Sequence, residues 1–448
     1  MSASGIDPVA AARRVLELSD AAGTEVITVQ EDGALTRFAN SEIHQNVMEH
    51  RVSLRIRVTE GDRVGVASTN QLDDAALRAT LARAREVAAA QAPEPGRPAL
   101  PGPAEVDPTP VTADTAGSTP DQRAEMVGRM CAIADAAGVR AFGAISADVA
   151  TYTVANSNGL LVSSPRCVAS ARIAAMDEAG SSGHGARASQ SINELDIEAA
   201  AAEAVDRAVR HRDPITLEAG HYPVVMEEEA IGELLEYLAY IGFGALAVEE
   251  GRTFMRPGER VSGPEINIWD DGLSPDGLPL PLDFEGIPRQ RVALVEAGVA
   301  TGVVHDLASA ARAGVRSTGH GLPGPNAFGP VATNLFLGGG TVPDKAALCE
   351  GIERGIWVTR LWYVNVVDPT TSVLTGMTRD GTFLIEDGRV TRPVRNMRFT
   401  QSIMEAFATC SGATRETKLV AGTDYDMVAG YRVPAMRLDS FNFTSATR

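Results

Sequence analysis

Residues 223–236 read PVVMEEEAIGELLE, an apolar run followed by three consecutive glutamates and the start of a helical pattern. From Ile231 to Leu238 the apolar residues recur at i, i+3, i+4 and i+7, the spacing of a helix that packs one face on a core. Glu229, Glu233 and Glu236 fall on the opposite face. Because the helix macrodipole favours acids in the first turn of a helix, one interpretation is a solvent-exposed face whose acidic residues stabilise the helix N-terminus.

The sequence after this segment is typical of a mostly β domain. From about residue 222 onward the chain carries longer apolar runs of β type, at 292–304, 333–337 and 356–359. We therefore predict a C-terminal, β-rich domain over residues 221–448, with the acidic helix packed on it.

The sequence before this segment contains one pattern written twice. Each copy predicts a helix, a strand meander and a second helix. The first copy comprises helices at 7–22 and 72–90 with strands near 25–29 and 52–58, and the second comprises helices at 121–138 and 193–210 with strands in 143–176. The expected N-terminal domain, residues 1–220, has halves of about 1–92 and 119–220, joined by the proline-rich segment 93–118. The predicted fold class is α+β.

Composition limits the function classes. A formal net charge of -18 and a pI near 4.9 argue against surfaces for nucleic acid or anionic membrane. No segment approaches the roughly 18 uninterrupted apolar residues of a membrane span, and the first residues lack the basic start and apolar run of a leader. The four cysteines form no CxxC pair, which is typical of a reduced compartment. We expect a cytoplasmic protein. Lysine is almost absent, with Lys345 and Lys418 as the only two, which suggests a high-GC bacterial coding bias.

Several common catalytic signatures are absent from the sequence. The seven histidines include no HExxH or HExxxH pair, and there is no GxSxG elbow or GxxxxGK[ST] loop. Residues 319–324 match GxGxxG in letters, but Pro323 and the glycine- and proline-rich residues after it cannot open the helix that a dinucleotide site needs. We interpret this segment as a loop.

The acidic helix resembles the helix on which TldD-type metallopeptidases carry a His-Glu-x-x-x-His zinc motif. Other segments follow in the order seen in TldD/PmbA proteins, and together with residues 57–67 they extend the resemblance over nearly the whole chain. These segments are FMRPGERV at 254–261, DFEGIP at 283–288, STG at 317–319, TNL at 333–335, ERGIWVTR at 353–360 and GMTRDG at 376–381.

The resemblance implies that the zinc site has been lost from this chain. Glu228 and Glu233 stand where active members have the two histidines, and Thr378 stands where they have a cysteine ligand. Only Glu229, at the position of the general base, is kept, and a base without a metal-bound water has nothing to activate. No cofactor and no metal are therefore expected in this chain. By resemblance it is the TldE/PmbA-like subunit of a heterodimer in which a TldD-like subunit carries zinc, and which cleaves unfolded peptides.

Two other functions remain open. Glu228, Glu229 and Glu233, with His305 or Asp283, could bind a divalent ion and activate water, and carboxylates alone would suit Mg, Ca or Mn better than zinc. Alternatively, the chain is a non-enzymatic peptide-binding or scaffolding homodimer.

One more cluster is a candidate for contact with substrate or partner. Trp357, Arg360, Trp362, Tyr363 and Asp368 are the densest group of aromatic and charged residues in the sequence. They fit either a packed strand with a polar rim or a cavity wall that touches peptide or a partner, because aromatic residues and arginine are enriched at interface hot spots.

Overall fold

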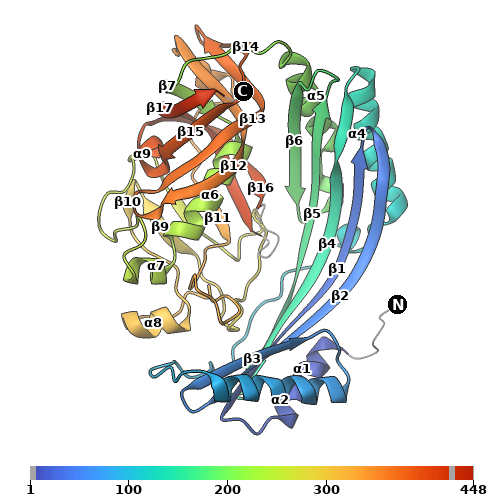
Figure 1. The fold of residues 1–448 in the computed structure, drawn as a ribbon, viewed down its shortest axis with the longest axis vertical. Coiled ribbons are helices and arrows are strands. Elements are labelled where there is room, and N and C mark those ends of the chain that lie inside the picture. Colours follow the sequence, from blue (N-terminus) through green and yellow to red (C-terminus); the bar gives the residue numbers. More distant parts are fainter. Residues whose placement is uncertain (1–6, 423–428, 447–448) are drawn as a thin grey trace.

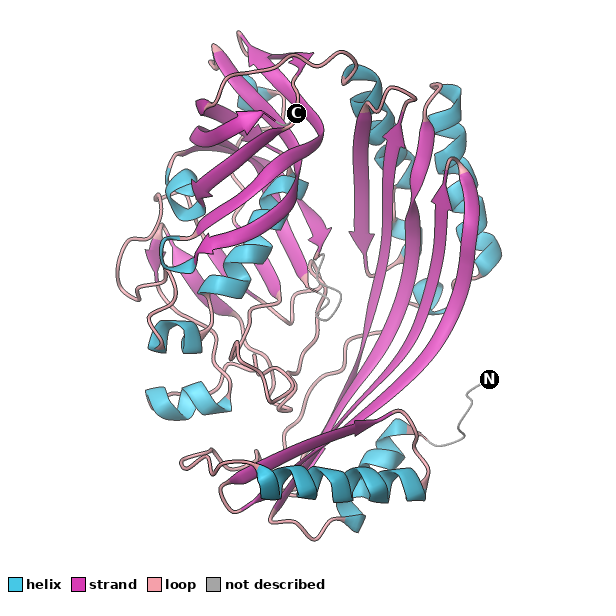
Figure 2. Ribbon diagram, viewed as in Figure 1, coloured by secondary structure: helices cyan, strands magenta, loops and turns pink. Residues whose placement is uncertain are grey.

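The computed structural model describes residues 7–422 and 429–446, and in this part of the chain the strands form two separate sheets. Figures 1 and 2 show a long, curved N-terminal sheet on one side and a C-terminal sheet wrapped around a helix on the other. Helices cover both sheets, so the predicted α+β class is confirmed. Among the described residues, no helix combines the length and apolar character that crossing a membrane requires.

The N-terminal sheet is built from two similar units. Its strand order is β3-β2-β1-β4-β5-β6, and every neighbouring pair is antiparallel. Each unit is a helix, a three-stranded meander and a helix, as predicted. The first unit comprises α1 (Pro8–Leu18), β1 (Gly23–Ala39), β2 (Glu42–Glu60), β3 (Arg63–Thr69) and α2 (Asp74–Ala90), and the second comprises α4 (Pro120–Ala136), β4 (Arg140–Asn156), β5 (Leu161–Met176), β6 (Ser182–Ser189) and α5 (Ile197–Arg210).

The two units join through their first strands and repeat one packing device. Residues 25–38 of β1 pair with residues 143–156 of β4 in the middle of the sheet. In each unit a glycine of the third strand touches the closing helix. A Cβ on Gly65 would lie 1.9 Å from the Ala84 carbonyl oxygen of α2, and one on Gly185 would lie 2.0 Å from the Ala200 carbonyl oxygen of α5. Only glycine permits helix and strand backbones to approach this closely.

The C-terminal sheet closes on itself. Along the order β17-β15-β13-β12-β7 the strands are hydrogen-bonded neighbours, and β7 pairs back with β17. The ring strands are β7 (Gly220–Met226), β12 (Arg354–Asp368), β13 (Val373–Glu386), β15 (Met397–Ser402) and β17 (Gly430–Ala446). The flanking strands are β8 (Ile268–Asp270), β9 (Val292–Glu296), β10 (Val299–Ala300), β11 (Asn334–Leu337), β14 (Arg389–Pro393) and β16 (Cys410–Ala421).

The acidic helix is α6 (Glu228–Gly242), and it packs against β12, β16 and β17. Ile231, Leu234, Leu235 and Leu238 are completely buried, so the apolar face predicted from their spacing is the face that enters the core. The remaining helices are short: α3 (Ala113–Ala116), α7 (Ala245–Glu249), α8 (Leu307–Ala313), α9 (Ile403–Ala408), and the 3-10 turns η1 (Ile192–Glu194), η2 (Ala347–Cys349) and η3 (Pro369–Thr371).

The two sheets meet where β6 and α5 face β13 and β16. At this contact the Ser182 hydroxyl donates to the Asp380 carboxylate at 2.6 Å, and Arg207 of α5 reaches the start of α6. Polar contacts thus connect the duplicated N-terminal sheet directly to the acidic segment.

Candidate functional site

The start of α6 is fixed by backbone hydrogen bonds to the neighbouring strand. After β7, the Glu227 N–H donates to the Val358 carbonyl of β12 at 2.9 Å, and the Ile231 N–H donates to the Glu227 carbonyl at 3.1 Å. Glu227 is the N-cap residue, but its side chain does not cap the helix. The carboxylate points instead toward the cationic side chains of Arg207 and Lys345, which belong to other segments of the chain.

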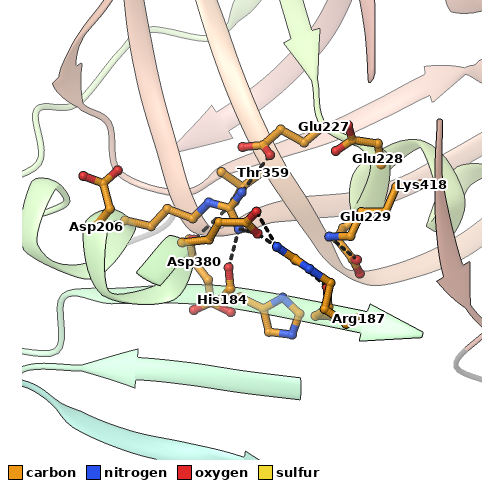
Figure 3. Close-up of polar contacts among 12 residues, drawn as sticks. His184, Arg187, Asp206, Glu227, Glu228, Glu229, Thr359, Asp380 and Lys418 are labelled. Carbon is orange, nitrogen blue, oxygen red and sulfur yellow. Dashed lines mark hydrogen bonds and ion pairs between the residues drawn. The ribbon is translucent and has the colours of Figure 1, made fainter. Parts of the chain in front are cut away.

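Glu227 is the centre of a buried ionic cluster, part of which appears in Figure 3. Its Oε2 accepts from Arg207 Nη2 at 2.7 Å and from Lys345 Nζ at 2.6 Å, and its Oε1 accepts from Trp357 Nε1 at 2.8 Å. Only 4% of the residue is exposed. Burial alone would raise the pKa of Glu227, but the charges of Arg207 and Lys345 outweigh it and hold the pKa below its ordinary value.

The other two glutamates of the triplet are also paired with lysine. Lys345 Nζ lies 3.2 Å from Glu228 Oε2, and Lys418 Nζ lies 3.3 Å from Glu229 Oε1. These are the only two lysines of the chain. Although burial alone would lower the pKa of Lys345, the charges of Glu227 and Glu228 raise it, so the ammonium form is favoured. The three acids therefore stand against two ammonium groups and the guanidinium of Arg207.

The expected solvated face is not found. The Glu229 side chain of that face is only 17% exposed, and Glu227 and Glu228 are 4% and 8% exposed, because α5, β12, β16 and the segment around Lys345 cover the first turn of α6. One turn further along, burial raises the pKa of Glu233 to about 7, and the nearby charges of Glu236 and Glu229 raise it too, against the opposing charge of Arg360. The spacing of the apolar residues correctly predicted the core face of α6, but it could not show which elements pack over the polar face.

A second layer of ion pairs surrounds the cluster. Glu203 of α5 accepts from Arg187 of β6 at 2.8 Å and lies 3.9 Å from Arg207. Burial would raise the pKa of Glu203, but the bond to Arg187 and the charges of Lys418 and Arg207 lower it to about 2. Acids and bases therefore alternate from α5 and β6 to the start of α6.

The predicted contact residues of β12 divide into separate environments. Trp357 faces the ionic cluster, whereas Trp362 and Tyr363 are 42% and 73% exposed. The Arg360 guanidinium lies 5.2 Å from the Trp362 ring centroid and 3.3 Å from Asp380 Oδ2. Asp368 accepts hydrogen bonds from the backbone N–H and hydroxyl of Thr370 and from the Thr371 hydroxyl, and so begins η3. A role of these five residues in binding peptide or partner stays a prediction.

Thr378 lies in the C-terminal sheet, and its hydroxyl is used in hydrogen bonds within that sheet. It is completely buried in β13, and its Oγ1 accepts from the Thr382 hydroxyl at 2.7 Å and from the Met397 N–H at 3.0 Å. Its hydroxyl is thus part of the hydrogen bonding between β13 and the start of β15.

The side chains at this site do not fit zinc. A zinc ion needs histidine, thiolate or carboxylate ligands that are free to donate lone pairs. Here Glu227 already accepts three hydrogen bonds, Glu228 and Glu229 are paired with ammonium groups, and those cations would repel a divalent ion. Asp283, considered above as a ligand, accepts instead from the backbone of Glu285, Ile287 and Gly321. Within residues 7–422 and 429–446, no three His, Cys, Asp or Glu side chains form a group that could hold a metal.

Comparisons with known proteins identify the family to which this chain belongs. Three family models match: PmbA/TldA metallopeptidase domain 1 at residues 24–88, the central domain at 114–212 and the C-terminal domain at 219–445. The chain belongs to the PmbA/TldA metallopeptidase family.

Individual relatives agree with this assignment. A metalloprotease TldD homologue of Haemophilus influenzae is 30% identical over 50% of this chain and 47% of its own length, and a Synechocystis metalloprotease is 27% identical over 46% and 44%. The matches thus span about half the length of these curated relatives. The crystal structure of TldE from Thermococcus kodakarensis superposes with a TM-score of 0.85 over 97% of this chain and 98% of the other, at 19% identity, and so shares the fold.

Sequence reasoning overlooked the cations of the site. Arg207, Lys345 and Lys418 lie 20, 118 and 189 residues from their glutamate partners, so no local motif joins them. The scarcity of lysine was an available signal, because both lysines of an arginine-rich chain serve the same three acids. It was interpreted only as coding bias.

Proposed function

We propose that this chain is the TldE/PmbA-like, non-catalytic subunit of a TldD/TldE-type metalloprotease complex that cleaves unfolded peptides in the cytoplasm. In this proposal a TldD-like partner carries the zinc, and this chain shapes the chamber in which the peptide is held. Nucleic acid and membrane have no part in it.

One observation carries the proposal. Two of the three glutamates at the zinc-motif positions are held in ion pairs, since Lys345 pairs with Glu228 and Lys418 pairs with Glu229. A general base must be able to take a proton from a bound water. Glu229 is paired with Lys418, and the described side chains around it do not form a metal site that would supply an activated water. The ion pairs serve the folding of this subunit, and the chemistry belongs to the partner.

The test is metal content and peptide cleavage of the purified chain, alone and mixed with the zinc-competent TldD-like protein of the same genome. We expect no stoichiometric metal in the chain alone and cleavage of an unfolded peptide only in the mixture. Size-exclusion chromatography with light scattering should show a heterodimer.

Three outcomes would oppose the proposal. Metal-dependent cleavage by the chain alone, lost in Glu229→Gln but kept in the exposed control Glu250→Gln, would favour a carboxylate-rich metal site. A stable homodimer that binds peptide without cleavage, and that does not join the TldD-like protein, would favour the scaffold function. Equal cleavage by the TldD-like protein with and without this chain would remove the subunit role altogether.

A further inference from the structure

Two adjoining cavities lie between the N-terminal sheet and the loops around α8. Their volumes are about 430 and 520 Å³, and they share the wall residues Arg57, Glu94, Arg97, Gly324 and Pro325. We name them together the crossover cleft, because the proline-rich crossover between the two N-terminal units forms one side. In Figure 1 this region lies between β3 and α2 below and α8 above. Each cavity has the size of a site that encloses a small ligand.

Three arginines line the smaller cavity of the crossover cleft: Arg55 and Arg57 from β2, and Arg97 from the crossover. Each has one hydrogen-bond acceptor among the described residues. Arg55 donates to the Gly324 carbonyl, Arg57 donates to Glu25 at 2.7 Å, and Arg97 donates to Glu94. The Nε of all three is buried without a partner in the described part of the chain. Since a guanidinium carries five N–H donors, most of the donors here have no protein acceptor.

Among these three arginines and the glutamates paired with them, one positive charge has no counter-ion. Glu25 neutralises Arg57 and Glu94 neutralises Arg97, but no ion pair forms with Arg55 within the described residues. Burial and the neighbouring charge of Arg57 lower the pKa of Arg55, against the opposing charge of Glu25. In the wall of the larger cavity, Glu285 accepts from the Leu307 N–H at 2.8 Å and Asp306 accepts from the Ser309 N–H at 2.7 Å, and neither forms an ion pair with Arg55 among the described residues.

We infer that the crossover cleft binds the carboxylate of a peptide ligand, held by Arg55, Arg57 and Arg97. This inference rests on the proposed function, in which the ligand of the complex is an unfolded peptide. Guanidinium groups bind carboxylates through paired N–H donors, and such charge-assisted bonds are strong. The cleft is therefore a binding subsite separate from the start of α6, with which it shares no lining residue.

The charge balance favours a carboxylate over a phosphate. A carboxylate carries a single negative charge, which matches the one positive charge without a counter-ion. A phosphate would bring more negative charge next to Glu25 and Glu94. The larger cavity, with the apolar side chains of Leu100, Leu307 and Leu322 in its walls, offers space for the residues that precede a terminal carboxylate.

The test is direct binding to the purified full chain by isothermal titration calorimetry, without a partner protein. The probes are N-acetylated tri-alanine with a free carboxylate, the same peptide as its C-terminal amide, and inorganic phosphate. The acid should bind and the amide should bind at least tenfold more weakly, because the amide forms no charge-assisted bond. Arg55→Gln should weaken binding of the acid by roughly tenfold or more. Arg51→Gln is the matched control, since it removes the same charge from an exposed position of the same strand.

Because Arg57 pairs with a buried glutamate, Arg55→Gln and Arg97→Gln are the variants of choice, and each is to be checked for an unchanged melting temperature. Equal binding of acid and amide, equal losses in Arg51→Gln and Arg55→Gln, or no binding of the acid at millimolar concentration would overturn the inference. Phosphate that binds more tightly than the peptide acid would overturn the assignment to carboxylate. Binding alone is measured, so a failure of the cleft is distinguishable from a failure of the proposed complex.

Discussion

Replacing Glu227 by glutamine tests whether the ionic cluster at the start of α6 holds the C-terminal sheet together. Glutamine keeps the shape and an acceptor for Trp357, but it leaves Arg207 and Lys345 facing a neutral amide. Removing one partner of a buried ion pair costs about 3–5 kcal/mol. Lys345 is 32% exposed and keeps Glu228, and Arg207 keeps Glu203 at 3.9 Å. We therefore expect the lower end, a loss of about 3 kcal/mol.

The assay is urea unfolding at pH 7, followed by tryptophan fluorescence. All three tryptophans lie between residues 269 and 362, so the signal reports on the C-terminal part. The control Glu250→Gln breaks an exposed pair and should change the free energy of unfolding by less than about 0.5 kcal/mol. The pKa of Glu227 is lowered in the folded state, so its contribution is present above the unfolded pKa and is lost as pH falls through the folded one. The difference between wild type and Glu227→Gln should shrink below about pH 4.5. A loss no larger than that of Glu250→Gln, or one independent of pH, would refute the reasoning.

Three further variants test other parts of the structure. Because burial raises the pKa of Glu233 to about 7, the wild type should lose stability as pH rises from 5 to 8. Glu233→Gln should remove up to about 3 kcal/mol of that loss. Parallel pH profiles of the two proteins would contradict this. Gly65→Ala should lower the melting temperature, because the added Cβ would clash with the α2 backbone. The control Gly128→Ala, on the open side of α4, should instead raise stability by up to about 1 kcal/mol. Equal melting temperatures of the two variants would contradict the close-packing argument. A chain ending at Asp439 loses the buried Phe441 and the end of β17, so it should be insoluble or melt lower, and unchanged solubility and melting would overturn this.

Much of the fold could be predicted because local patterns determine it. The helices expected at 72–90 and 121–138 are α2 at Asp74–Ala90 and α4 at Pro120–Ala136, each started by a side-chain cap. The repeated unit could be recognised because both copies show the same order of helix-type and strand-type spacing of apolar residues. The pairing of β1 with β4 was not visible, since it joins residues more than 100 positions apart. The apolar run 292–304 looked continuous but contains the turn between β9 and β10, where Gly298 adopts a φ of +77°.

The candidate site was less predictable than the fold. Spacing along α6 correctly gave the buried face, because helix geometry alone decides it. The environment of the acids depends on Arg207, Lys345 and Lys418, which come from three distant elements and carry no shared spacing. Family resemblance drew attention to Glu228 and Glu229, but it gave no indication that both are paired with lysine.

The placement of the two lysines makes amine chemistry a direct probe of one site. Apart from the N-terminus, the only primary amines of the chain are Lys345 and Lys418, 32% and 23% exposed and both held by carboxylates at the start of α6. Acylation of the purified protein, mapped by mass spectrometry, would therefore report on this ionic cluster almost alone. Apart from links at the N-terminus, amine-directed cross-linkers would likewise capture a partner only where it approaches these two positions. A reagent that labels most proteins over their whole surface becomes, for this chain, specific to a single region.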